Sequence, residues 1–376
     1  MRPSAAREPL PDALRALAML AVLVVNAAGY LVAPWGPLLG ERTPPDSGVA
    51  TAVQGLTAAM LQGKGYPMLA FLFGMGLVLA SRGREPMLAS ARATTRQKRL
   101  LVLGVLHGVF VYFGDILTMY ALIGWHLLSR VREPWRSFRR RLWRALWWAL
   151  GVTALTVLLM LFIAMQPDLA GEPTMPADEP AVVQALRWVD FWIVNASAYG
   201  VIQVGSLLLA WPVLRLCMLC GIAAARLRLL THRRWRAALE RWIVRTALPL
   251  LLLNLGYGWA YISASTGSER AFWVESLGNL IGPPFAAVYV MVLALAARGG
   301  TAAWCRSLAP LGQRTLTLYV GHGLLCVLLF GGVGLGLELS TLDMAIFSVV
   351  LWSLALALAH ASRARRWPLE AWLARR

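Results

Sequence analysis

The chain has 376 residues, of which 59% are hydrophobic and 14% are charged, and its formal net charge is +18. This apolar composition, with a mean hydropathy of +0.61, excludes an ordinary soluble protein and predicts an integral membrane protein. The positive charge does not indicate nucleic-acid binding, because the basic residues lie in short blocks between apolar runs. The four cysteines lie in or beside apolar segments, so the sequence predicts neither a disulfide framework nor a metal site.

Apolar runs of about 20 residues predict membrane-spanning helices, because a bilayer tolerates no unpaired backbone group. We therefore expect an all-α, polytopic membrane bundle of about ten spans. The spans are expected at residues 13–33, 52–80, 100–114, 116–129, 145–165, 204–225, 245–263, 272–297, 315–333 and 344–361. The second span should break or bend at Gly63 to Pro67, and residues 100–129 make two helices only if Gly114 allows a tight turn.

The connections between these spans alternate in charge. Residues 82–99 carry six basic residues and one acidic residue, and residues 130–144 and 226–245 carry seven and one each. Lys and Arg gather on cytoplasmic loops, so both termini are expected in the cytoplasm. Residues 187–203 would reverse this pattern if they crossed, so we expect an interfacial or re-entrant helix there, on the outer face.

Three regions follow from this pattern. An N-terminal membrane half of about five spans covers residues 1–165. An outer loop with the interfacial or re-entrant helix covers residues 166–203, and a C-terminal membrane half covers residues 204–376. The proline- and acid-rich stretch "QPDLAGEPTMPADEP" marks the boundary between the halves.

The first two spans contain polar residues that a bilayer penalises. Arg15 and Asn26 are 11 residues apart, so they share one face of the first span with about 16 Å of rise between them. Lys64 lies in the expected break of the second span. Such residues are expected to face the bundle interior or a water-filled cavity. Each also has a structural reading: Arg15 as a cytoplasmic anchor, Asn26 as a helix-packing hydrogen bonder and Lys64 as a snorkelling lysine.

The third span carries His107 near mid-membrane, and Asp115 follows eight residues later in "FGDIL". On a continuous helix the two side chains would be about 80° apart around the axis and about 12 Å apart along it, too far for contact. We therefore predict that Asp115 caps the next helix and that His107 finds its partners on other spans. Asn26 and Lys64 are the expected partners.

Several stretches resemble the YeiB-like family of bacterial inner-membrane proteins, whose C-terminal half is a domain of unknown function, number 418. They are "PDALRALAMLAVLVVN", "GKGYPMLAFLFGMG", "RLLVLGVLHGVFVYFGDILTMYALIG", "LGQRTLTLYVGHGLL" and "RWPLEAWLARR". The most specific part is the pattern R…H…GDIL..YA, formed by Arg99, His107, Gly114, Asp115, Ile116, Leu117, Tyr120 and Ala121.

The C-terminal motif departs from this family. Gln313, Leu318 and His322 stand where the family tends to have arginine, asparagine and glutamine. Arg314 is expected to substitute for the arginine one position along. His322 is read either as a packing residue or as a second cavity residue.

The first span is also similar to that of transmembrane acyltransferases, in which an arginine is followed after ten intervening residues by a histidine. Here Asn26 stands at the histidine position after Arg15. The resemblance implies that Arg15 binds the phosphate of an acyl donor and that His107 replaces the missing imidazole.

Two functional hypotheses follow. The first is transfer of an acyl group from cytoplasmic acyl-CoA to an acceptor hydroxyl or amine. Its expected catalytic residues are His107, Asn26 and Lys64, and its expected substrate- or cofactor-binding residues are Arg15, Arg99, Asp115, Tyr120, Arg314 and His322. The second is a transporter or flippase of a small organic or lipid-linked substrate, with His107 and Asp115 as a proton relay. A membrane scaffold without chemistry is a third alternative.

Overall fold

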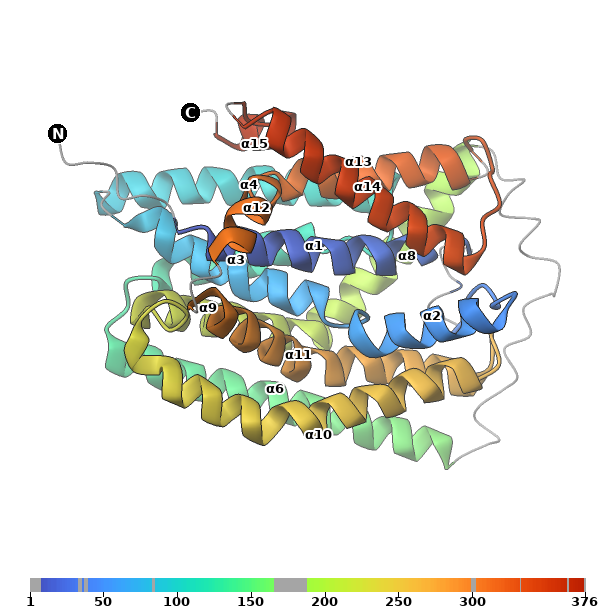
Figure 1. Ribbon diagram of the computed structural model, residues 1–376, viewed down its shortest axis with the longest axis horizontal. Helices are drawn as coiled ribbons and strands as arrows, with labels where there is room; N and C mark the ends of the chain where they lie inside the picture. Colours follow the sequence, from blue (N-terminus) through green and yellow to red (C-terminus); the bar gives the residue numbers. More distant parts are fainter. Residues whose placement is uncertain are drawn as a thin grey trace.

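The computed structural model describes residues 8–32, 36, 40–82, 85–165, 188–298, 302–331, 333–363 and 365–374. These residues form helices and turns with no strand, which confirms the all-α class (Figure 1). The elements are α1 (Leu10–Ala28), α2 (Gly48–Met60), α3 (Gly65–Ser81), α4 (Pro86–Phe110), α5 (Leu117–Leu127), η2 (Leu128–Arg130), α6 (Trp135–Ala164), α8 (Trp188–Leu208), α9 (Ala210–Leu227), η3 (Arg233–Trp235), α10 (Arg236–Ser263), α11 (Glu269–Arg298), α12 (Ala302–Gly312), α13 (Thr315–Phe330), α14 (Thr341–Ala361) and α15 (Pro368–Ala374).

The number of helices that suit a bilayer is close to the expected ten. Within the described residues, eight helices or joined helices are long and apolar enough to cross a membrane, and the bent pair α12–α13 would make a ninth. Neither α4 nor α5 qualifies by itself, since α4 carries basic residues in its first half and α5 has only 11 residues. The expected placement of residues 187–203 on the outer face stays a prediction, because α8 also suits a span.

The long helices present apolar side chains to their surroundings. In α6, Trp147 and Leu155 are each 67% exposed, and in α10 Val244 is 80% exposed. Only 11% of the most apolar stretch of α6 is buried inside the protein. These outward faces fit contact with a lipid bilayer. The expected boundary between the membrane halves falls on residues 166–187, which lie outside the described residues.

The second span is interrupted at residues 61–64, which overlap the start of the expected range from Gly63 to Pro67. Residues 61–64 separate α2 from α3, and Gly63 has a positive φ of 74°. A β-carbon at Gly63 would lie 2.3 Å from the carbonyl oxygen of Gly278 in α11, so only glycine fits. The carbonyls freed by the break are bonded inside the protein: Tyr289 donates to Met60 O and Lys64 to Ala58 O.

Residues 100–129 do form two helices with Gly114 in the turn between them. α4 ends at Phe110 and α5 begins at Leu117. Asn195 of α8 stabilises the turn: its Nδ2 donates to the carbonyls of Gly108 and Val109. α5 therefore returns beside the second half of α4.

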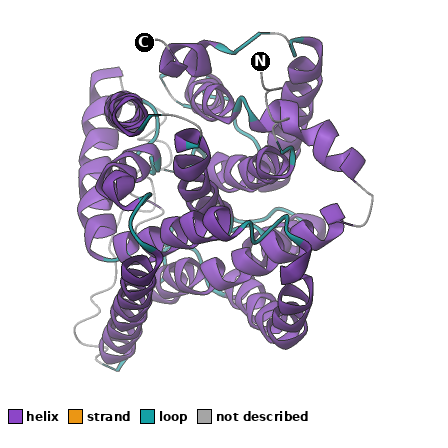
Figure 2. Cartoon of the chain, turned by 90° about the vertical axis from the view of Figure 1, so that its left-hand side faces the viewer, coloured by secondary structure: helices purple, strands orange, loops and turns teal. Residues whose placement is uncertain are grey.

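The arginine-rich connections lie together at one end of the bundle, at the left of Figure 1. Arg82, after α3, donates to a carbonyl at the end of α9, and Arg132, before α6, donates to a carbonyl at the end of α3. Arg226 of α9 lies over the ring of Trp135 at the start of α6. The start of α1 and the helix α15 lie toward the same end, which Figure 2 views from outside. This grouping agrees with the orientation expected from the loop charges.

Helices α3 and α9 pack backbone against backbone at two glycines. A β-carbon at Gly221 would lie 1.9 Å from Phe71 O, and one at Gly74 would lie 2.0 Å from Met218 O. We therefore expect Gly221→Leu to separate the two helices and to destabilise the protein by roughly 3 kcal/mol, the upper end of overpacking costs. Thermal unfolding of the purified protein in detergent measures this effect. Gly256→Leu, in open space on α10, is the control, and equal melting temperatures for both variants would contradict the close packing.

Candidate functional site

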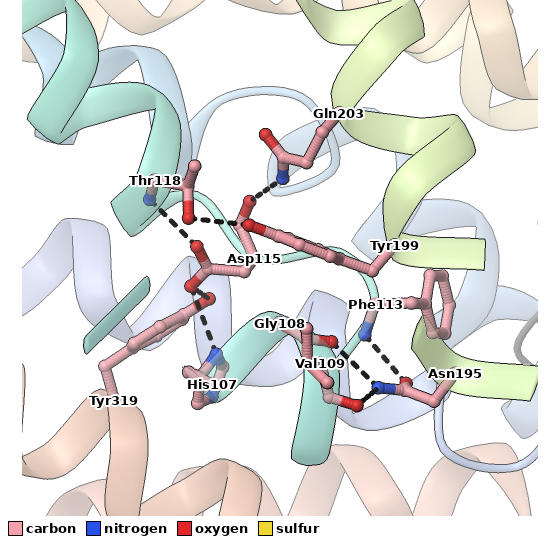
Figure 3. A network of polar contacts seen from close by, with 10 residues as sticks. All are labelled: His107, Gly108, Val109, Phe113, Asp115, Thr118, Asn195, Tyr199, Gln203 and Tyr319. Carbon is pink, nitrogen blue, oxygen red and sulfur yellow. Dashed lines mark hydrogen bonds and ion pairs between the residues drawn. The ribbon is translucent and has the colours of Figure 1, made fainter. Parts of the chain in front are cut away.

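The clearest polar site lies where α4 turns into α5. His107 Nδ1 is 3.1 Å from Asp115 Oδ1, and both residues are 3% exposed (Figure 3). The expectation that these side chains are too far apart for contact was wrong. It assumed a continuous helix, whereas α4 ends at Phe110 and the turn at Gly114 folds Asp115 back toward His107.

Asp115 has three further hydrogen bonds, two of them to its side chain. Its Oδ2 accepts the backbone N–H of Thr118 at 2.9 Å, which confirms the expected cap of the following helix. The hydroxyl of Tyr319, from α13, donates to Oδ1 at 3.4 Å. The backbone carbonyl of Asp115 accepts from Gln203. The carboxylate therefore joins α4, α5 and α13.

One face of α8 holds this site in place. Asn195, Tyr199 and Gln203 are spaced four residues apart, so they share one face of the helix. Asn195 bonds the end of α4 and accepts the N–H of Phe113 at 3.0 Å. Tyr199 OH lies 2.9 Å from Thr118 Oγ1. None of these three residues was predicted from the sequence, although polar side chains spaced four apart in an apolar helix are a signal that could have found them.

The second ring nitrogen of His107 has no such partner. Nε2 is buried and has no hydrogen bond within the described part of the chain. A β-carbon at Gly323 of α13 would lie 2.8 Å from Nε2 and 3.0 Å from the hydroxyl of Tyr30. Because a carboxylate only accepts hydrogen bonds, we assign the ring proton to Nδ1 and a lone pair to Nε2. The lone pair of His107 Nε2, which can accept a proton, thus lies between α1 and α13.

Tyrosine rings lie near the His107 imidazole. Tyr319 lies against the imidazole of His107 with 4.8 Å between ring centroids, and Tyr30 stacks on Tyr112 at the same separation. Asn26 lies in the last turn of α1, which ends at Ala28, and Tyr30 lies in the turn that follows this helix. The predicted contact between Asn26 and His107 stays a prediction.

Lys64 lies apart from this site. It is 1% exposed, its Nζ donates to Ala58 O at 3.0 Å, and it lies 5.3 Å from the centroid of the Tyr257 ring in α10. The hydrogen-bond partner of His107 is Asp115, so the expected pairing with Lys64 was wrong. Lys64 instead satisfies the backbone of the broken span.

The three arginines of the predicted binding set bond to protein groups. Arg15 donates to Asp12 and, at 3.2 Å, to Leu72 O, and its side chain is 20% exposed. Arg99 donates to the carbonyl of Trp372 in α15 at 2.9 Å. Arg314 donates to carbonyls of the segment that follows α14. Arg99 and Arg314 thus hold the C-terminal segment, and Arg15 lies in the first half of α1, nearer the arginine-rich end of the bundle.

The remaining two predicted residues have different surroundings. The hydroxyl of Tyr120 donates to Tyr66 O and so ties α5 to the start of α3. His322 Nε2 lies 3.5 Å from Cys326 Sγ, and the ring lines a groove between α13 and α14. Gly323 faces His107 from the next position, so α13 separates the groove from the His107 site.

The fold and this site define a helical membrane protein with a buried histidine–carboxylate pair. Its residues 224–376 match the family described as "Protein of unknown function (DUF418)". Over 377 residues the chain is 26% identical to "Uncharacterized protein YeiB" of Escherichia coli (strain K12), a match that covers 91% of this chain and 88% of that protein. The chain thus resembles YeiB over most of its length, and its C-terminal part matches the DUF418 family model, as the sequence motifs predicted.

Proposed function

We propose that this protein transfers an acyl group from cytoplasmic acyl-CoA to an acceptor hydroxyl or amine in the bacterial inner membrane. The observation that carries this proposal is the pair of His107 and Asp115, with Nε2 of His107 buried and without a hydrogen bond among the described residues. A carboxylate on Nδ1 fixes the tautomer and stabilises the imidazolium that forms when Nε2 accepts a proton.

The chemical step uses one proton acceptor. Nε2 of His107 takes the proton of the acceptor hydroxyl or amine, whose oxygen or nitrogen attacks the thioester carbonyl. The carbon–sulfur bond then breaks, and the imidazolium returns the proton to the CoA thiolate. The hydroxyl of Tyr30 also approaches Gly323, and we assign it as a donor for the developing oxyanion.

Two guanidinium groups converge on α3 nearer the arginine-rich end. Arg15 donates to Leu72 O, and the guanidinium of Arg96 lies 5.1 Å from the centroid of the adjacent ring of Phe73. Paired guanidinium groups suit phosphate, because each offers several donors in a planar fork. This arrangement supports the proposal that Arg15 and Arg96 bind the phosphates of acyl-CoA.

A buried amide adjoins these groups. Gln97 is 0% exposed, and neither its Oε1 nor its Nε2 has a hydrogen bond among the described residues. A β-carbon at Gly124 would lie 3.1 Å from this Oε1 and 2.7 Å from the ring of Phe73. Gln97 precedes His107 by ten residues, which is about 15 Å along α4. The pantetheine arm of CoA is an extended chain with amide groups, and these features suit the stretch of α4 between Gln97 and His107.

The test measures transfer directly. Proteoliposomes containing the purified protein receive acyl-CoA labelled in the acyl group, and label in membrane-extractable or soluble acceptors is followed by chromatography and mass spectrometry. We expect transfer with release of free CoA. Passage of an unmodified substrate across the vesicles, without any acyl donor and without CoA release, would instead support the transport reading.

Arg15→Ala is expected to raise the KM for acyl-CoA by about ten- to a hundredfold, the effect of losing one or two charged hydrogen bonds. The KM for the acceptor should not change, because Arg15 lies about 16 Å of helix rise from Asn26. Arg233→Ala, at an exposed site before α10, controls for the loss of one cytoplasmic charge. A donor KM unaffected by Arg15→Ala would remove Arg15 from the donor site.

A further inference from the structure

A groove of about 240 Å³ runs between α13 and α14, on the side of α13 away from His107. Both helices pack against α1. Its lining is almost entirely apolar and includes Leu318, Gly321, His322, Leu354, Leu358 and Trp367. From Thr317 to Leu325, the groove follows α13 for about 12 Å.

The groove is unfilled and faces the surroundings of the bundle. A β-carbon at Gly321 would meet no atom within 4 Å. On the opposite wall, Leu354 and Leu358 are 62% and 58% exposed, and α14 is itself apolar enough to span a bilayer. A chain in the groove would therefore lie in the hydrocarbon layer, against apolar side chains on both sides.

One end of the groove adjoins a cluster of exposed arginines. Trp367 closes this end, and its Nε1 donates to Ser362 Oγ at 3.0 Å. Arg314 is 4% exposed and donates to the carbonyls of Ser362, Arg363 and Arg365. With these carbonyls bonded inward, the side chains of Arg363, Arg365 and Arg366 remain exposed.

We propose that the groove between α13 and α14 binds an anionic phospholipid of the cytoplasmic leaflet. One acyl chain lies between Gly321 and Leu354, and the phosphate headgroup lies on Arg363, Arg365 and Arg366. Charge complementarity selects this occupant, because basic pockets on the cytoplasmic side of a helix pair recognise anionic headgroups. The apolar groove accounts for the chain, and the arginine cluster accounts for the headgroup.

The proposal is tested by photocrosslinking in vesicles. The protein is reconstituted in phosphatidylcholine with a trace of phosphatidylglycerol that carries a photoactivatable group on one acyl chain, and labelled peptides are identified by mass spectrometry. We expect peptides of α13 and α14 to be labelled at least about tenfold more than with the matching phosphatidylcholine probe. Equal labelling by the two probes would overturn the proposal.

Two variants test the chain and headgroup sites separately. Gly321→Leu fills the groove and should remove the label from α13 and α14, whereas Gly256→Leu, in open space on α10, should not. Replacing Arg363, Arg365 and Arg366 by alanine should lower phosphatidylglycerol labelling to about the level of the phosphatidylcholine probe and leave phosphatidylcholine labelling unchanged. This exposed triple variant remains informative if Gly321→Leu does not fold. Unchanged phosphatidylglycerol labelling in the triple variant would also overturn the proposal.

Discussion

His107→Gln is expected to reduce acyl transfer by about 10²- to 10⁴-fold, the usual contribution of a positioned general base. The glutamine amide can still donate to Asp115, so the buried carboxylate keeps a partner and the fold is retained. It cannot accept a proton at neutral pH. Transfer from labelled acyl-CoA in proteoliposomes, measured as kcat, gives the effect.

His107→Ala should reduce transfer to a similar extent, and His126→Ala is the matched control because His126 is exposed on the neighbouring helix α5. Size-exclusion elution and thermal unfolding show whether each variant is folded. If folded His107→Gln transfers label at the wild-type rate, His107 is not the base.

Asp115→Asn is expected to lower kcat by roughly 10³-fold or more. The amide would donate to Nδ1 of His107 and so place the ring proton on Nε2, where the base is needed. Its oxygen would still accept the N–H of Thr118, so the cap of α5 survives. The same transfer assay measures the change, and thermal unfolding separates it from a loss of stability.

Asp343→Asn provides the control for this substitution. Asp343 also accepts hydrogen bonds at a helix start, in the capping box of α14 with Ser340, but it is far along the chain from His107. We expect this variant to retain full transfer. An Asp115→Asn variant that transfers label as fast as Asp343→Asn would restrict Asp115 to a capping role.

The sequence predicted the parts of the fold that depend on apolar length and on loop charge. Apolar runs indicated most of the helices, and "LQGKGYP" located the broken span to within a few residues, because a Gly-rich break has a local cause. The division of 100–129 into two helices also followed from Gly114. Which helices cross a bilayer was harder to predict, since α8 is apolar enough to cross yet carries three polar side chains on one face.

The candidate site was predicted less completely. His107 and Asp115 were chosen for their cost in an apolar setting, but their contact depends on the backbone path of a turn, which residue spacing on an ideal helix misrepresents. The partners of Arg99 and Arg314 are backbone carbonyls of the C-terminal segment, and no pattern of residue types identifies a carbonyl acceptor. The acceptor of Lys64 is likewise a backbone carbonyl, that of Ala58, so its partner could not be predicted from residue types either.

The polar face of α8 restricts how this protein can move. Asn195, Tyr199 and Gln203 bond the end of α4, the start of α5 and the turn between them, over about 12 Å of helix. Sliding α8 by even one residue would break all of these bonds at once inside an apolar environment. Helices α4, α5 and α8 are therefore expected to move as one rigid unit around His107. Any gate that admits a ligand to Nε2 has to open on the opposite side, by movement of α13 or α1.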